Sequence, residues 1–240
     1  MRASVANSSI RFISTSRAVF SSALSASDAE LVASLSKEIS EEKTNEEASL
    51  SKLPADIGAF LTNSGFSIAE SAPGTDEIEL IKKNGGETIR VYFAVSDVTE
   101  NSNEIFEEGE VEAENEIEDG PASPIRINIV VSKDNAESKG ALSIEAISQD
   151  DVFLIENVVP YVNLETATAN SANGEFSRRL AYRGPSFENL DEGLQSAFEV
   201  YLESRGINVE LAQFITEYSY WKENVEYVNW LSKVKSIIEA

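Results

Sequence analysis

The sequence predicts an α+β fold in which one antiparallel sheet is flanked by helices near both ends of the chain. Three observations support this prediction. Apolar residues recur at helical spacing near the two ends, and they alternate with polar residues along seven segments in the middle. No helical pattern separates those seven segments, which argues against the parallel sheet of a doubly wound fold. We therefore expect one domain over 28–240, preceded by a segment of different composition.

Two helices are expected between residues 27 and 65. The first begins at Ser27, a helix-capping residue followed by acidic side chains, and it ends in the polar stretch 41–47. The second runs from about Pro54 to Gly65, because proline favours the first turn of a helix and glycine favours the position after its last turn.

The middle of the chain alternates with a period of two residues, as expected for strands with one buried face and one wetter face. Turn residues such as those at 84–86 separate the strands. The expected strands are Phe66–Ala72, Glu77–Lys83, Glu87–Val95, Pro124–Lys133, Ala141–Ser148, Asp151–Val159 and Glu175–Tyr182.

Two further helices are expected after residue 184. One begins at Phe187 or Asn189 and ends at Gly206, and Asn208 caps a longer one that runs to the C-terminus. The apolar residues of the long helix fall at steps of three and four, a pattern typical of a packed face or a subunit contact. They are Leu211, Phe214, Tyr218, Trp221, Val225 and Val228.

The chain is strongly acidic, with 19 Lys and Arg against 42 Asp and Glu and a formal charge of −23. Such a field repels nucleic acids and attracts cationic partners, so direct nucleic-acid binding is not expected. His and Cys are absent, which excludes His- or Cys-based catalytic and metal sites but leaves carboxylate chemistry open. The doublet Arg178-Arg179 is interpreted as an ion-pairing element of the last strand, within the sheet or between subunits.

The first 27 residues differ from the rest of the chain. They contain three Arg, many Ser and no acidic residue, which is the composition of a mitochondrial transit peptide. The alternative is a disordered basic tail. Apolar runs are too short for a membrane span, so none is expected.

The segment 100–120 is the candidate binding site. Ten acidic residues and no Lys or Arg lie between 100 and 119, so we expect a disordered insertion that binds basic proteins. The alternatives are a solvated spacer and a calcium site, and the latter lacks the usual loop spacing. The candidate binding residues are Glu104, Glu107, Glu108, Glu110, Glu112, Glu114, Glu116, Glu118 and Asp119.

The C-terminal quarter resembles a known family. The residues that carry the resemblance are Tyr182-Arg183-Gly184-Pro185, Phe187-Glu188-Asn189-Leu190-Asp191-Glu192, Tyr201-Leu202-Glu203-Ser204-Arg205-Gly206-Ile207-Asn208 and Trp230-Leu231. They are similar to the mitochondrial acidic matrix protein family, also called the mitochondrial glycoprotein family. Its animal member is the complement-binding, splicing-factor-associated protein, and the fungal and plant branches look nearest.

The resemblance implies a ring-shaped homotrimer of strongly twisted seven-stranded sheets, and a location in the mitochondrial matrix. It also implies a non-catalytic role as scaffold or chaperone for basic mitochondrial proteins, such as ribosomal proteins or precursors. Through these clients it would support mitochondrial ribosome assembly, translation and the respiratory complexes. No catalytic, cofactor or metal residues are implied. The alternative function is a carboxylate-based divalent-cation buffer or an enzyme of unknown reaction.

Overall fold

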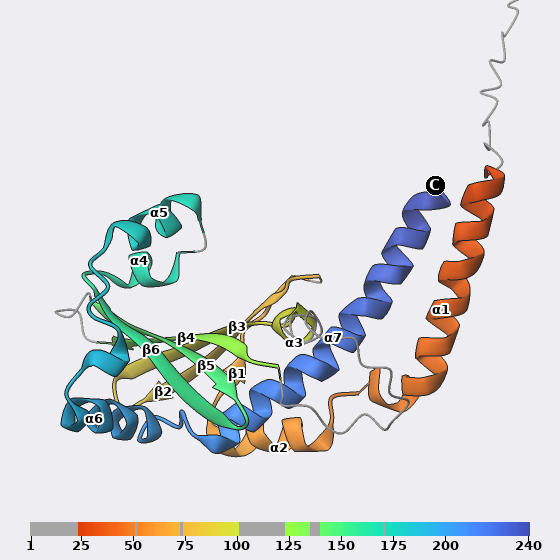
Figure 1. Cartoon of the computed structure of the whole chain (residues 1–240). Coiled ribbons are helices and arrows are strands. Elements are labelled where there is room, and N and C mark those ends of the chain that lie inside the picture. Colours follow the sequence, from red (N-terminus) through yellow and green to blue (C-terminus); the bar gives the residue numbers. More distant parts are fainter. Residues whose placement is uncertain (1–23, 51, 73, 101–122, 135–139, 170) are drawn as a thin grey trace, which may run out of the picture.

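In the part of the chain that the structure describes, six strands form one antiparallel sheet, and each strand pairs with its neighbours in sequence (Figure 1). The computed structural model describes residues 24–50, 52–72, 74–100, 123–134, 140–169 and 171–240. Within them the strands are β1 (Ser67–Ile68), β2 (Glu77–Asn84), β3 (Glu87–Ala94), β4 (Ile125–Lys133), β5 (Ala141–Gln149) and β6 (Val152–Tyr161). The predicted antiparallel sheet is confirmed, although β1 is much shorter than expected.

The predicted strand Glu175–Tyr182 is wrong, because these residues belong mainly to a helix. Helices α4 (Leu164–Thr168) and α5 (Ala172–Leu180) follow β6 and form a small lobe. The hydroxyl of Ser171 caps α5 by accepting the backbone N–H of Gly174 at 3.1 Å. The alternation of apolar and polar residues was misleading, since Phe176 and Leu180 are also four positions apart and share one side of a helix.

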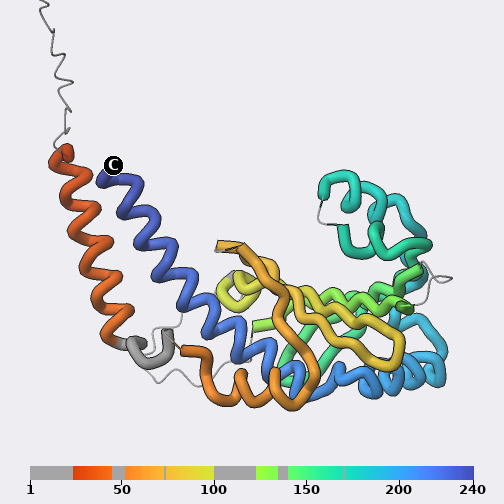
Figure 2. The backbone as a smooth tube through the Cα atoms, turned by 180° about the vertical axis from the view of Figure 1, so that it is seen from behind, coloured from red at the N-terminus to blue at the C-terminus, as the bar shows by residue number. Residues whose placement is uncertain are grey.

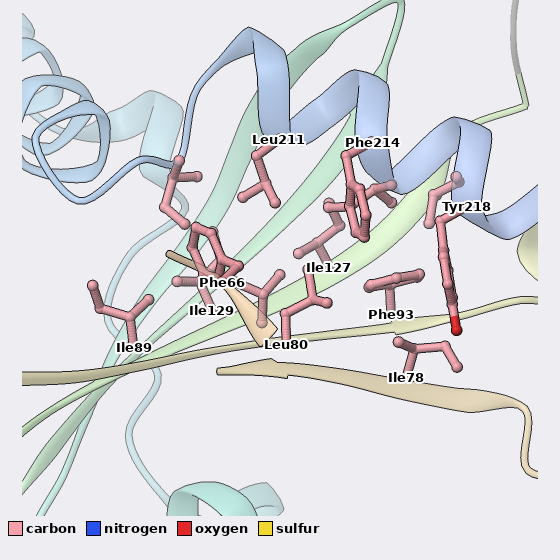
Figure 3. Packing of buried hydrophobic residues seen from close by; sticks show 14 of the residues in the cluster. Phe66, Ile78, Leu80, Ile89, Phe93, Ile127, Ile129, Leu211, Phe214 and Tyr218 are labelled. Carbon is pink, nitrogen blue, oxygen red and sulfur yellow. The ribbon is translucent and has the colours of Figure 1, made fainter. Parts of the chain in front are cut away.

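Helices α2 (Ala55–Ser64) and α7 (Val209–Ile238) contribute apolar side chains to the main core together with one face of the sheet. In Figure 3, Leu211, Phe214 and Tyr218 of α7 face the apolar side chains of the strands. The ring of Phe214 stacks on Phe60 of α2 at 4.4 Å and on Tyr218 at 5.6 Å between ring centroids. The first half of the predicted apolar stripe is therefore core.

The predicted ends of three helices are confirmed. Gly65 and Gly206 have positive φ values of 76° and 86°, a conformation that glycine adopts without strain. Asn208 caps α7 by accepting the backbone N–H of Leu211 at 3.2 Å. The expected helix start at residues 187–189 is only a 3₁₀ turn, η2 (Phe187–Asn189). Asp191 then caps α6 (Glu192–Glu203).

Helix α1 (Ala26–Leu50) lies beside the C-terminal half of α7, and the two form an arm that projects from the sheet (Figures 1 and 2). Its cap is Ser25 rather than the expected Ser27. Ser25 and Asp28 exchange two hydrogen bonds of 3.1 and 3.2 Å, a reciprocal arrangement that satisfies two backbone N–H groups. In the part of the chain that the structure describes, no helix is long and apolar enough to cross a membrane.

Candidate functional site

The predicted binding residues lie in the segment 101–122, outside the described residues. They are Glu104, Glu107, Glu108, Glu110, Glu112, Glu114, Glu116, Glu118 and Asp119. The structure does describe the two points from which this acidic segment starts and to which it returns, namely the short helix α3 (Asp97–Glu100) and the start of β4.

These two points are tied to each other by Asp97. Its side chain is buried, and one carboxylate oxygen accepts the backbone N–H of Arg126 at 2.8 Å. Asp76 holds the start of α3, since its carboxylate accepts the N–H and the hydroxyl of Ser96 at 2.8 and 2.9 Å. Helix α3 contacts α7, and its Val98 is part of the main core. The base of the acidic segment is therefore fixed beside α7.

A groove of about 350 Å³ lies next to this base, between the turn that precedes β2, the start of α3 and the middle of α7. We call it the α7 groove. Its aromatic residues are Tyr227 and Trp230, whose rings stack at 6.3 Å with an angle of 13° between their planes. Its remaining lining residues are Gly74, Thr75, Asp76, Val95, Ser96, Glu223, Glu226, Asn229 and Lys233.

Glu223 is a partly buried carboxyl in this groove. Burial and, to a lesser extent, the negative charge of Glu42 on α1 raise its pKa above the ordinary value for glutamate. Within the described residues it has no hydrogen-bond or ion-pair partner, whereas Glu226 pairs with Lys222 one turn before it. Among the described residues, Glu223 thus brings a negative charge into the groove without a bonded cation.

The sheet face opposite α7 carries the polar side chains of Glu79, Arg90 and Tyr92, beside a small apolar cluster that includes Val130, Val159 and Ala167 of α4. Tyr92 donates its hydroxyl hydrogen bond to Glu79 at 3.0 Å, and Arg90 pairs with the same carboxylate oxygen at 3.2 Å. Burial, with the charge of Glu79, raises the pKa of Tyr92. This face matches the wetter side that the alternating pattern predicts.

Most of the described basic side chains are used within the chain. Nine of them form ion pairs with carboxylates: Lys37, Lys83, Arg90, Lys133, Arg179, Arg183, Arg205, Lys222 and Lys235. Arg178 instead donates to the backbone carbonyls of Thr166 and Ala169, at 3.2 and 2.7 Å. The doublet Arg178-Arg179 thus lies in α5 and not in the predicted strand. Arg179 forms its ion pair with Glu175 of the same helix.

No group of three or more carboxylates among the described residues is arranged to hold a metal ion. The raised pKa of Glu223 comes from burial and from Glu42 of the packed arm. The geometry of the described residues thus gives no support to the cation-buffer alternative.

The sequence model of the mitochondrial glycoprotein family matches residues 35–238. The chain belongs to this family. The resemblance seen in the C-terminal quarter is thereby confirmed and extends over nearly the whole described chain. A mitochondrial acidic protein, mam33, of Schizosaccharomyces pombe is 34% identical over 225 residues, which span 87% of this chain and 78% of that relative.

Other proteins are similar to this chain in sequence or in fold. An uncharacterised mitochondrial protein of Arabidopsis thaliana is 26% identical over 170 residues, covering 71% of this chain and 61% of its own length. Two solved structures share the fold with a TM-score of 0.65 each and cover 89% of this chain. One is a Leishmania major protein of unknown function, described as a homologue of human p32, at 21% identity over 99% of its length. The other is the Trypanosoma brucei p22 protein, at 23% identity over 100% of its length.

Sequence reasoning did not find the α7 groove. Tyr227 and Trp230 lie outside the predicted apolar stripe of α7, and that offset was a signal that a second side of the helix is apolar. The loop residues that complete the groove come from positions 74–76, more than 140 residues earlier in the sequence, and no periodic pattern connects them to α7.

Proposed function

We propose that this member of the mitochondrial glycoprotein family is a non-catalytic acidic scaffold or chaperone of the mitochondrial matrix that binds basic proteins. The observation that carries the proposal is the unbalanced charge. The chain has a formal charge of −23, while nine of its described bases are already paired with its own carboxylates. The excess of carboxylates over bases attracts cationic proteins and disfavours nucleic acids.

The clients that fit this surface are basic mitochondrial proteins, such as ribosomal proteins or imported precursors. Holding them until they reach their destination would support ribosome assembly, translation and the respiratory complexes. The acidic segment 100–120 is the proposed main attachment site, because it concentrates ten carboxylates without any Lys or Arg.

The protein is proposed to work as a homotrimer. The arm of α1 and α7 projects from the sheet, and on it Leu31 and Ile237 are 47% and 72% exposed. Apolar side chains on a projecting pair of helices favour a contact between subunits. The number three and the ring shape come from the family resemblance.

The location in the matrix rests on residues 1–27, proposed as a cleaved transit peptide. Removing its three arginines leaves 16 basic against 42 acidic residues, so the mature chain would be still more acidic. N-terminal sequencing of the protein isolated from mitochondria should then begin between about residues 18 and 28. If the protein at steady state still began at Met1 or Arg2, the proposed location in the matrix would be wrong.

Crosslinking in intact mitochondria followed by mass spectrometry tests the choice of clients. We expect the crosslinked partners to be enriched in basic proteins relative to the matrix proteome, because the long-range field favours their encounter with this chain. A partner set with the average charge of matrix proteins would contradict the proposal.

A further inference from the structure

The α7 groove combines an apolar floor with an exposed aromatic ring. Trp230 is 57% exposed, although it stacks on Tyr227 and lies near Val95 of the sheet end. Leaving a large aromatic side chain in water forfeits the free energy of burying it, so an exposed tryptophan in a concave place indicates a binding surface.

The charge of the groove is negative and only partly balanced. Glu223 has no cation partner among the described residues, and Asp76 is held by hydrogen bonds from Ser96 rather than by a base. Lys233 is the only base among the described lining residues, and its Nζ lies toward Gly74, 3.4 Å from the position of a side-chain Cβ there. A cation placed between Glu223 and the aromatic pair would reduce the cost of keeping this carboxylate partly buried.

We propose that the α7 groove binds one face of a basic amphipathic helix, with an Arg or Lys side chain against Trp230 and Glu223 and an adjacent apolar side chain on the groove floor. The inference rests on the proposed binding of basic clients and names the site and the kind of segment that it selects. Cation–π contact with the ring, the ion pair and apolar burial act together there. Charge alone would not select an amphipathic client from a merely basic one.

Two observations favour this occupant over a second copy of the chain. The lining contains Asp76, Glu223 and Glu226 against Lys233, so it repels another strongly acidic protein and attracts a basic one. The groove also shares Ser96 with the start of α3, and the acidic segment begins at Glu100, four positions later. A client attracted by that segment therefore arrives beside the groove.

Binding of a fluorescein-labelled amphipathic peptide to the full chain, followed by fluorescence anisotropy, tests the proposal. The peptide has Leu on one face and Arg on the other over about five helical turns. A second peptide replaces Leu by Ser and keeps every Arg. The groove variants are Glu223→Gln and Trp230→Ala. Their controls are Glu70→Gln, an exposed loop carboxylate, and Tyr220→Ala, an exposed aromatic of α7 outside the groove.

We expect each groove variant to bind the amphipathic peptide about five- to tenfold more weakly than wild type does. This is the effect of losing one cation–π or ion-pair contact. The controls should change the affinity for this peptide less than about twofold, because Glu70 and Tyr220 are exposed side chains that do not line the groove. The Ser-substituted peptide should bind wild type more weakly, because it has no apolar side chain to bury on the groove floor.

The outcomes separate the inference from the function on which it rests. If neither peptide binds at low salt, the proposed function fails as well. If both bind but the groove variants behave like their controls, the groove is the wrong site while binding of basic clients stands. If Trp230→Ala instead lowers the oligomeric state in light scattering, a second copy covers the groove and the inference is overturned.

Discussion

The carboxylate of Glu87 lies 2.9 Å from the guanidinium of Arg205, although 118 residues separate the two in the sequence. Both side chains are largely buried, with 7% and 15% of their surface exposed. Lys133 binds the same carboxylate, and the Arg205 guanidinium lies 3.4 Å from the centre of the Tyr201 ring. The connection between α6 and α7 is thereby fixed to the end of the sheet, and with it the start of α7.

Breaking this contact should destabilise the fold. Arg205→Met leaves the buried Glu87 carboxylate with Lys133 alone, and we expect a loss of about 3–5 kcal/mol in the free energy of unfolding. The matched control is Arg183→Met, which breaks a more exposed pair with Glu145 and should cost less than about 1 kcal/mol. Urea denaturation measures the free energy of unfolding of both variants. Equal losses would show that the buried Glu87–Arg205 pair stabilises the fold no more than the exposed Glu145–Arg183 pair does.

The same carboxyl predicts a dependence of stability on pH. The hydrogen bond from Lys133, helped by Arg205, holds the pKa of Glu87 below its ordinary value of 4.5. As the pH falls, the unfolded chain therefore takes up this proton before the folded chain does. The stabilisation by Glu87 is complete above pH 4.5 and is lost as the pH falls toward and through the lowered folded-state pKa.

Thermal melting of wild type and Glu87→Gln from neutral to acidic pH checks this expectation. The variant should be less stable at pH 7 and should lose less stability on acidification, because it has no proton to take up at this position. Parallel curves for the two proteins would mean that the pKa of Glu87 is the same in the folded and the unfolded chain.

Replacing a glycine by alanine should lower the stability of the chain in α5 and raise it in α2. A Cβ at Gly174 of α5 would lie 2.6 Å from the Cβ and 2.7 Å from the carbonyl oxygen of Ala169, so Gly174→Ala should cost about 1–3 kcal/mol and disturb the α4–α5 lobe. A Cβ at Gly58 of α2 meets nothing within 4 Å. Gly58→Ala should therefore stabilise the chain by up to about 1 kcal/mol. Circular dichroism melts compare the two variants, and a neutral Gly174→Ala would mean that the lobe packs less tightly.

The two tryptophans of α7 should differ in their effect on stability. Trp221 packs against the main core and contacts the ring of Tyr218, so Trp221→Ala should cost about 2–4 kcal/mol, less than a fully buried tryptophan. Trp230 is 57% exposed, and Trp230→Ala should cost about 1 kcal/mol or less. Chemical denaturation gives both values. A larger loss for Trp230 would indicate that a neighbouring subunit buries it.

Local signals predicted much of this fold. The caps at Gly65, Gly206 and Asn208 follow from what single residues prefer, and the strands up to β6 follow from alternation and turn residues. The segment around Phe176 failed because a short alternating pattern fits a strand and a helix equally well, and the caps at Asn163 and Ser171 decide for helices. The Glu87–Arg205 contact and the α7 groove join residues far apart in the sequence, and such pairings leave no periodic signal.

A salt titration of client binding tests the central claim, electrostatic capture of basic proteins, most directly. The client is a purified basic mitochondrial protein, measured against wild type and a variant in which eight glutamates of the acidic segment become glutamine. These are Glu104, Glu107, Glu108, Glu110, Glu112, Glu114, Glu116 and Glu118. The variant should associate more slowly, because it presents a weaker field to the approaching client.

For wild type, the affinity should fall steeply as the salt concentration passes physiological strength, where charges are screened over about 8 Å. The variant should show a shallower fall, because fewer carboxylates take part. A steep fall shared equally by both proteins would move the site from the acidic segment to a face of the folded domain. An affinity for wild type that does not change with salt would contradict electrostatic capture itself.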